Sequence, residues 1–176
     1  MSMKSKSDIS NSAIRMLLQS VGSFYDKSRG FPSFNKRGSE WTEVTNFFEN
    51  RCCYCGQILD SDNATEDHLI PINKTALGLH AWGNIVPCCR HCNKEKHYND
   101  WVDFVKTKCG SEKECTQRID RIQSFQKKWK YNPNLRLKDV AQNLYEDVGE
   151  VSAVLIKLRL EQAQKIIQRS LSDKGI

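Results

Sequence analysis

The sequence predicts an α+β protein that is mostly helical, with a cysteine-rich core between two helical regions. Apolar residues recur at helical spacing in both outer parts of the 176-residue chain. From Arg51 to about His97 that spacing gives way to cysteines, short β-like runs, glycine and proline. Apolar residues make up 39% of the chain and charged residues 27%, which is typical of a globular protein and excludes collagen-like or wholly disordered chains.

Two helices are predicted before the core. The first runs from Ser7 to Tyr25, and its expected apolar face contains Ile9, Ala13, Met16, Leu17 and Val21. The second runs from Ser39 to Asn50, with Ser39 as the candidate N-cap. We expect its stripe to lie in the core: Trp41, Val44, Phe47 and Phe48.

Three helices are predicted after the core. They cover Trp101 to Val105, Lys113 to Lys130, and Leu137 to Leu171. The second of these should turn Ile119, Ile122 and Phe125 inward, and the third contains Gly149 as a candidate kink. The chain is thereby divided into an N-terminal helical region (1–46), a core (47–101) and a C-terminal helical region (102–176).

The charge distribution is uneven. The formal net charge is +6 and the isoelectric point about 8.9, values compatible with a polyanionic partner. Residues 101–140 alone have an excess of five positive charges. The chain has no apolar run of the ~18 residues that span a bilayer, and its beginning lacks the apolar stretch of a secretory signal, so a cytoplasmic location is expected.

Eight cysteines without an export signal favour metal binding over a disulfide framework, because cytosolic thiols are kept reduced. Two C-x-x-C pairs, Cys52 with Cys55 and Cys89 with Cys92, have the spacing of a tetrahedral zinc site. The neighbouring Cys53 and Cys88 blur the frame, but only this choice gives two equal pairs. The alternative is that the pairs are core thiols or a redox motif. Two further cysteines are interpreted as ordinary free thiols: Cys109 and Cys115.

The 33 residues between the pairs exceed the ~12–20 residue spacer of common zinc fingers and ribbons. They contain Glu66-Asp67-His68-Leu69-Ile70-Pro71, then a polar loop with glycines, then Trp82-Gly83-Asn84-Ile85-Val86-Pro87. At these positions the sequence resembles the HNH endonucleases of the ββα-metal class in their zinc-bound form. The resemblance rests on C-x-x-C-G, D-H-x-x-P, the middle Asn84, and C-x-x-C-N-x-x-K ending at Lys96, and it covers residues 47–101.

The chemistry of the Asp67-His68 pair agrees with this resemblance. A strand end can aim both side chains at one cleft, a carboxylate suits Mg²⁺ or another hard cation, and a neutral imidazole can take a proton near pH 7. Phosphodiester hydrolysis needs both a bound metal ion and a group that takes a proton. The resemblance implies that His68 is the general base and Asp67 a ligand of Mg²⁺ or Mn²⁺. The alternative for the pair is a capping or salt-bridged role.

Other roles follow from the same resemblance. Asn93 and, with lower rank, His97 one turn further along the helix would bind the catalytic metal. Asn84 would tie the loop together and hold His68 in position, unless it is a simple turn residue. Lys96 is expected to approach a DNA phosphate or else to be solvated. His80 and His91 match no catalytic position and are interpreted as surface residues.

The resemblance implies a metal-dependent endonuclease acting on double-stranded DNA and leaving a 5′-phosphate. Its setting is interpreted as restriction or antiviral defence. The basic segment with Trp129 would track the DNA backbone, or be a solvated face: Arg118, Arg121, Lys127, Lys128 and Lys130. The alternative function is a zinc-stabilised nucleic-acid-binding module that does not cut alone or acts only within a larger complex.

A homodimer is the expected assembly, because one cleft with one general base serves one strand at a time. The last predicted helix offers a stripe with spacings of four and three: Leu137, Ala141, Leu144, Val148, Val151, Leu155 and Leu158. The alternative is that this stripe packs on the chain's own core.

Overall fold

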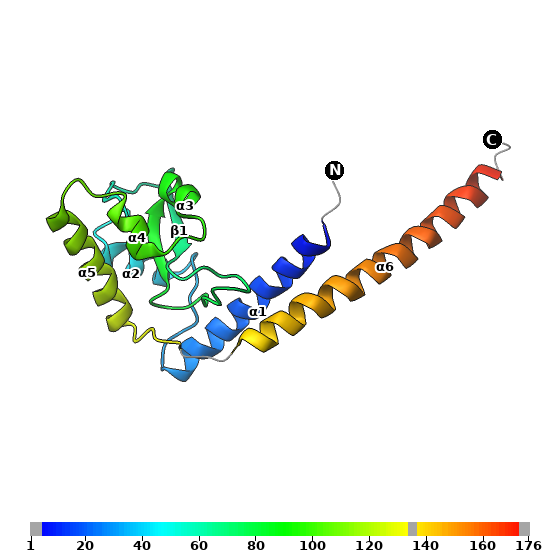
Figure 1. Ribbon diagram of the computed structural model, residues 1–176, viewed down its shortest axis with the longest axis horizontal. Coiled ribbons are helices and arrows are strands. Elements are labelled where there is room, and N and C mark those ends of the chain that lie inside the picture. Colours follow the sequence, from blue (N-terminus) through cyan, green and yellow to red (C-terminus); the bar gives the residue numbers. More distant parts are fainter. Residues whose placement is uncertain (1–4, 134–136, 173–176) are drawn as a thin grey trace.

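The computed structural model describes residues 5–133 and 137–172, with backbone only for 167–172. The order of elements is α1 (Lys6–Ser28), α2 (Ser39–Phe47), β1 (Ala64–His68), β2 (Ile85–Cys89), α3 (Arg90–Lys96), α4 (Trp101–Lys106), α5 (Glu112–Lys128) and α6 (Lys138–Ser172). The predicted fold class, α+β and mostly helical, is therefore confirmed (Figure 1).

The two strands form an antiparallel pair that leads directly into a helix. Ala64 lies opposite Cys89 and His68 opposite Ile85, so His68 is the last residue of β1. β2 is wholly buried, and α3 follows it without a loop. Cys89 is the N-cap of α3, and its sulfur accepts the backbone N–H of Cys92 at 3.4 Å. The result is a strand–strand–helix unit in which strand ends and a helix start meet.

One hydrophobic cluster draws on all three predicted divisions of the chain. Phe34 and Val44 come from before the cysteine-rich region, Trp82 and Val86 from within it, and Phe125 from after it. Trp82 and Trp129 lie 4.1 Å apart between ring centroids. Described residues from all three divisions, 1–46, 47–101 and 102–176, thus contribute to this core.

The predicted apolar face of the first helix is wrong by part of a turn. In α1 the buried positions recur every four residues and are Ser10, Ile14, Leu18, Gly22 and Asp26. Met16 is 67% exposed, whereas Leu17 and Val21 are partly buried. The difference arises because α1 packs against α6 and the loop at His80, where small and polar residues permit close approach.

The helices around the core agree with the sequence more closely. Val44 and Phe48 are buried, and Trp41 and Phe47 pack against the cluster. Ser39 is not the cap of α2, however, because it is the first helical residue and Gly38 precedes it without a side-chain bond. In α5 two of the predicted inward residues are fully buried and the third is partly buried: Ile122, Phe125 and Ile119.

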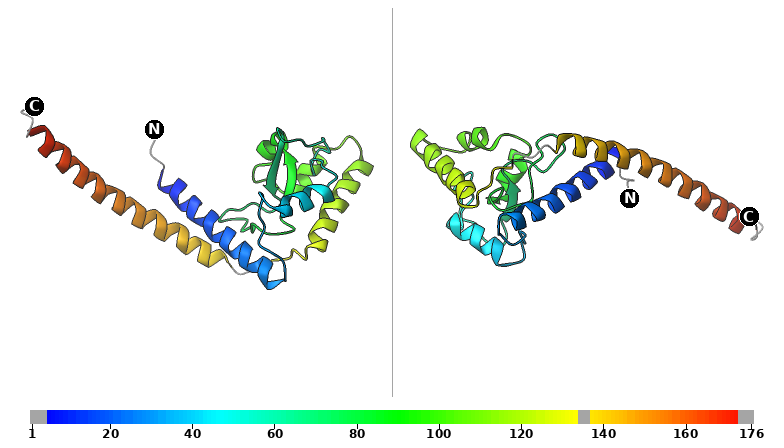
Figure 2. Two further views of the ribbon diagram at one scale, coloured as in Figure 1. Left: turned by 180° about the vertical axis from the view of Figure 1, so that it is seen from behind. Right: turned by 90° about the horizontal axis from the view of Figure 1, so that it is seen from below.

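The long helix α6 lies beside α1 over its first half and then continues past the start of α1 (Figures 1 and 2). Leu137, Ala141 and Leu144 join a second hydrophobic cluster with residues of α1. Gly149 produces no break in α6 but lets it approach α1, because a Cβ there would lie 2.8 Å from the Ser10 hydroxyl. The first half of the predicted stripe therefore packs on the chain itself.

Among the described residues, no helix is long and apolar enough to cross a membrane.

Candidate functional site

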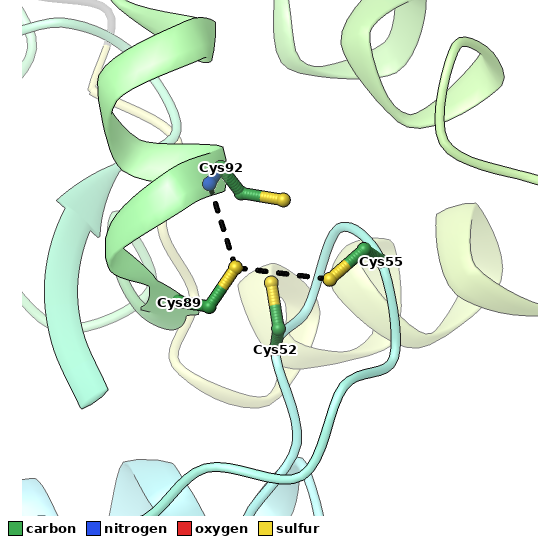
Figure 3. Close-up of side chains that lie close together, drawn as sticks. All are labelled: Cys52, Cys55, Cys89 and Cys92. Atoms are coloured by element: carbon green, nitrogen blue, oxygen red, sulfur yellow. Dashed lines mark hydrogen bonds between the residues drawn. The ribbon is translucent and has the colours of Figure 1, made fainter. Parts of the chain in front are cut away.

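Four cysteine sulfurs converge where the loop after α2 meets the start of α3. Cys52 and Cys55 lie on the loop, and Cys89 and Cys92 lie at the end of β2 and in α3 (Figure 3). All four sulfurs lie within 4.8 Å of one another, and those of Cys55 and Cys89 are 3.8 Å apart. Three of the side chains are buried and Cys55 is half-buried.

This cluster fits a zinc ion. Zn–S bonds of about 2.3 Å in a tetrahedron place two sulfurs about 3.8 Å apart, which is the separation of Cys55 and Cys89. Hydrogen bonding from Cys92 lowers the pKa of Cys52 to about 5, so the thiolate that a metal needs is favoured there. The cluster can therefore hold zinc with four sulfurs, which leaves no open position for water.

The remaining cysteines lie outside this cluster. Cys53 and Cys88 are buried in the hydrophobic core, and burial raises the pKa of both thiols. Cys109 and Cys115 are half-buried, and the sulfur of Cys109 donates to the Val105 carbonyl. The frame chosen from the sequence thus corresponds to the sulfurs that the fold brings together.

A second site lies beside α3, in a cavity of about 270 Å³. Its lining combines the end of β1, the start of the next loop, α3 and α1: Arg15, Asp67, His68, Pro71, Ile72, Asn93, His97 and Tyr98. Four of the predicted site residues therefore share one cavity. α1 contributes Arg15, an exposed residue that the sequence did not single out.

Asp67 is held by two buried partners. Its Oδ2 accepts the Tyr54 hydroxyl at 2.6 Å and lies 3.0 Å from the ammonium of Lys96. Within the described residues no hydrogen bond reaches Oδ1, which leaves that oxygen for a cation in the cavity. The prediction that Lys96 reaches a DNA phosphate is wrong, because its side chain is fully buried and also donates to the His68 carbonyl at 2.9 Å.

His68 is kept neutral by its surroundings. Burial lowers its pKa to about 3, and the charges of His80, Arg15 and Lys96 act in the same direction. Its Nε2 lies 3.1 Å from Nδ1 of His80, so the two rings share a hydrogen bond. His68 thus has a neutral imidazole whose Nδ1 is the nitrogen not engaged by His80.

His80 and His91 were both expected at the surface, and the structure agrees only for His91. His91 is 72% exposed and pairs with Glu95 at 3.2 Å. His80 is half-buried, bonded to His68, and packed edge-on against Phe34 at 5.6 Å between ring centroids. Sequence reasoning missed it because its neighbours His68 and Phe34 are distant in the chain.

Asn84 fastens the loop between the two strands. Its Oδ1 accepts the backbone N–H of Ile70 at 2.8 Å, and its Nδ2 donates to the carbonyls of Ile70 and Leu79. Its own carbonyl accepts the N–H of Leu69. The fully buried Asn84 therefore fixes the chain directly after His68 and directly before His80.

Asn93 and His97 close the cavity from α3. The Asn93 amide nitrogen lies 3.3 Å from both the Thr65 hydroxyl and the Glu66 carbonyl, which turns its oxygen to other partners. His97 follows α3 with a φ of 47°, and its ring lies 3.8 Å from that of Tyr98. Both residues line the cavity that contains Asp67 and His68.

The basic segment of α5 is largely engaged within the fold. Arg118 donates to the carbonyls of Tyr54 and Cys55 and pairs with Glu114, so it supports the first C-x-x-C loop. Arg121 pairs with Glu49 and Lys128 with Glu43, whereas Lys127 and Lys130 are exposed. Trp129 is buried in the core and is therefore not available to DNA. None of these basic residues lines the cavity, and in Figure 1 α5 and α1 lie on opposite sides of the sheet.

In a comparison with family models, residues 52–103 match the model of the HNH endonuclease family. The matched segment begins at the first zinc-site cysteine and ends within α4, and it contains Asp67, His68, Asn84 and Asn93. A search of curated proteins found no match. This segment is therefore similar to HNH endonucleases, and the similarity favours a nuclease activity and a nucleic-acid substrate.

Proposed function

We propose that this protein is a metal-dependent endonuclease that hydrolyses phosphodiester bonds in double-stranded DNA. The observation that carries the proposal is the cavity where Asp67, His68, Asn93 and His97 meet beside Arg15. It contains the neutral imidazole of His68, side-chain oxygens that can bind a metal ion, and the cationic side chain of Arg15. Its volume is large enough for a phosphate group. A restriction or antiviral defence role is the setting we favour.

The residues divide the work as follows. Asp67, through Oδ1, would hold Mg²⁺ or Mn²⁺ with the Asn93 oxygen and His97, and the bound ion would stabilise negative charge on the phosphate and the leaving oxygen. His68 takes the proton of the attacking water, and the hydroxide attacks phosphorus as the 3′ oxygen leaves. The anionic phosphate raises the basicity of His68 by offsetting Arg15 and Lys96. Arg15 is placed to bind that phosphate.

Zinc has a structural part in this proposal. The four cysteines join the loop after α2 to β2 and α3, and α3 presents Asn93 and His97 to the cavity. A fully sulfur-coordinated zinc supplies no water for hydrolysis, so the two metal sites have separate tasks.

The test is incubation of supercoiled plasmid with the zinc-loaded protein in Mg²⁺, Mn²⁺ or EDTA. We expect cleavage with Mg²⁺ or Mn²⁺, none with EDTA, and none with His68→Ala. The matched control is His91→Ala, because His91 is exposed and lies outside the cavity. Binding of DNA without cleavage under all conditions would favour the alternative, a zinc-stabilised nucleic-acid-binding module.

We further propose that the second half of α6 pairs with a second copy of the chain. Val151, Leu155 and Leu158 continue the stripe beyond α1 and are 46–58% exposed. Other large apolar side chains are exposed on the same stretch: Val154, Ile156, Leu160 and Ile166. A projecting helix with so much exposed apolar surface is marginal in water and is typical of an interaction site.

Sedimentation of the full chain tests this pairing. We expect a dimer for the wild type and a monomer for Leu155→Glu/Leu158→Glu, with Lys157→Glu as the control at an exposed charged residue of the same turn. A shortened chain should end after Glu150, because the first half of α6 covers α1. A full chain that stays monomeric on DNA and only nicks it would contradict the dimer.

A further inference from the structure

Tyr54 lies between the four-cysteine cluster and the cavity. It directly precedes Cys55 in the first C-x-x-C loop, and its side chain extends from that loop to Asp67, which lines the cavity. The Tyr54 hydroxyl donates to Oδ2 of Asp67 at 2.6 Å, although the two residues are 13 positions apart in the chain. A side chain of the zinc-site loop therefore contacts the residue that we propose as a ligand of the second metal.

The position of this hydroxyl is fixed by the fold. Tyr54 is fully buried, and its ring packs edge-on against that of Phe104 at 5.2 Å between ring centroids. Its carbonyl oxygen accepts Nη1 of Arg118 at 2.8 Å, and the preceding residue, Cys53, donates its N–H to the Pro87 carbonyl at 2.9 Å. Because both the backbone and the ring are held, the hydroxyl keeps one position.

The two carboxylate oxygens of Asp67 have different surroundings. Oδ2 has two donors, the Tyr54 hydroxyl and the ammonium of Lys96 at 3.0 Å. The hydroxyl is the donor in its bond, because an ionised carboxylate has no proton to give. Within the described part of the chain, Oδ1 takes part in neither of these contacts. The orientation of Oδ1 therefore follows from the two contacts of Oδ2.

We propose that Tyr54 is a positioning residue for the second metal, because its bond to Oδ2 of Asp67 fixes the orientation of Oδ1, the oxygen left for the ion. The inference rests on the proposed function, which makes Asp67 a ligand of Mg²⁺ or Mn²⁺. Residues that hold a metal ligand by a hydrogen bond typically contribute about 10–100-fold to metal affinity or activity. The first C-x-x-C loop thus has a second task besides holding zinc.

Lys96 alone would not hold the carboxylate in this orientation. Its ammonium also donates to the His68 carbonyl at 2.9 Å, and a single contact on Oδ2 leaves the carboxylate free to turn about its bond to Cβ. The hydroxyl bond of 2.6 Å has the length of a charge-assisted O–H···O⁻ bond, which is directional. Removal of the hydroxyl should therefore loosen the Asp67 carboxylate but keep its ion pair with Lys96.

Binding of Mn²⁺ to the full chain tests this role without an activity measurement. In zinc-loaded protein, electron paramagnetic resonance of unbound Mn²⁺ gives the Kd, and zinc stays in the four-cysteine cluster because thiolates favour zinc over Mn²⁺. We expect Tyr54→Phe to raise the Kd for Mn²⁺ about 10–100-fold with unchanged zinc content. The matched control is Tyr25→Phe, which removes a hydroxyl that accepts the Asn132 N–H and does not line the cavity. Its Kd should equal that of the wild type.

Two further measurements separate positioning from a general loss of structure. Tyr54→Phe keeps the buried ring, so its melting temperature should fall by only about 3–12 °C, the loss expected for one hydrogen bond to a charged group. In a plasmid assay, the variant should need about 10–100-fold more Mn²⁺ for half of its maximal rate. The maximal rate should approach that of the wild type. A merely structural role would lower the maximal rate and leave the Mn²⁺ requirement unchanged.

The outcomes separate this inference from the proposed function. An unchanged Kd for Mn²⁺ in Tyr54→Phe, or no binding of Mn²⁺ by the wild type, would overturn the positioning role even if the wild type cuts DNA. Loss of zinc from Tyr54→Phe would also overturn it, because the hydroxyl would then support the zinc site itself. A wild type that binds Mn²⁺ through the Tyr54 hydroxyl but does not cut DNA would instead support the role of Tyr54 and contradict the endonuclease assignment.

Discussion

Removal of the Lys96 ammonium should destabilise the protein, although a lysine in a short polar helix is usually replaceable. Lys96 is fully buried and contacts Asp67 at 3.0 Å and the His68 carbonyl at 2.9 Å. Lys96→Met keeps the length of the side chain but leaves a carboxylate that is only 12% exposed without its cation. Breaking such a buried pair on one side lowers the free energy of unfolding by about 3–5 kcal/mol.

The assay is thermal or urea unfolding of zinc-loaded protein. For a chain of this size, about 2–4 °C of melting temperature corresponds to each kcal/mol, so Lys96→Met should melt about 6–20 °C lower. Lys94→Met, exposed on the same helix, is the control and should change stability by less than about 0.5 kcal/mol. In Asp67→Asn/Lys96→Met, the loss should be smaller than the sum of the single losses, because neither charge is left alone. A Lys96→Met protein that is as stable as Lys94→Met but binds DNA more weakly would refute the buried-pair reasoning.

Four further predictions concern the metal sites and the loop. Cys89→Ser should give insoluble or zinc-free protein, whereas Cys109→Ser should retain one zinc per chain by elemental analysis; zinc-free protein that is folded and active would contradict a structural zinc. His68→Ala should reduce cleavage ~10²–10⁴-fold with DNA affinity nearly intact. In a plasmid assay, the loss of cleavage in Asp67→Ala and Asn93→Ala should be partly offset by a higher Mg²⁺ concentration. Cleavage by His68→Ala at the wild-type rate would contradict the role of His68 as the general base. Gly22→Ala should lower the melting temperature because the added Cβ would lie 2.3 Å from the His80 carbonyl oxygen. Gly110→Ala is the control and should not lower it, because the nearest atom to its Cβ is a Glu114 side-chain oxygen at 3.5 Å. Equal melting temperatures of the two variants would show that α1 can move away from the His80 loop. Burial raises the pKa of Asp26 to about 6, so the contribution of this carboxyl group to the free energy of unfolding is full below about pH 4 and is lost as the pH rises through 6. Relative to Asp26→Asn, wild-type stability measured by urea unfolding should fall from pH 5 to 6.5 and then stay level. A difference between the two proteins that does not change with pH would contradict this.

The sequence predicts the local parts of this molecule well, because their signals are local. C-x-x-C spacing fixes which sulfurs share a turn, and the periodicity of α5 identifies its inward residues. Asp67 and His68 are adjacent in the chain, and their place at the end of β1 follows from the motif.

The parts that sequence reasoning missed depend on contacts between distant segments. Arg15 reaches the cavity from more than 50 residues away, and no pattern in α1 marks it. The buried state of Lys96 depends on Tyr54 and Asp67, which are distant in the chain. The residues next to Lys96 in the sequence therefore do not distinguish it from a solvated lysine. The predicted inward face of α1 differs from the observed one because Ser10, Gly22 and Asp26 are buried for close approach and polar bonding, not for hydrophobicity.

The contact of α1 with the cavity means that the segment matched by the family model does not contain the whole site. Residues 52–103 contain the four clustered cysteines and the residues that line the cavity from β1 and α3. They do not contain Arg15, the Asp26 carboxylate that accepts the Trp82 N–H, or the Tyr131 hydroxyl that accepts the Leu79 N–H. A fusion carrying only the matched segment would keep the ligands and lose the supports of the loop that positions His80. A segment that keeps these contacts is therefore longer than residues 52–103, and it extends from α1 to the half of α6 that packs on α1.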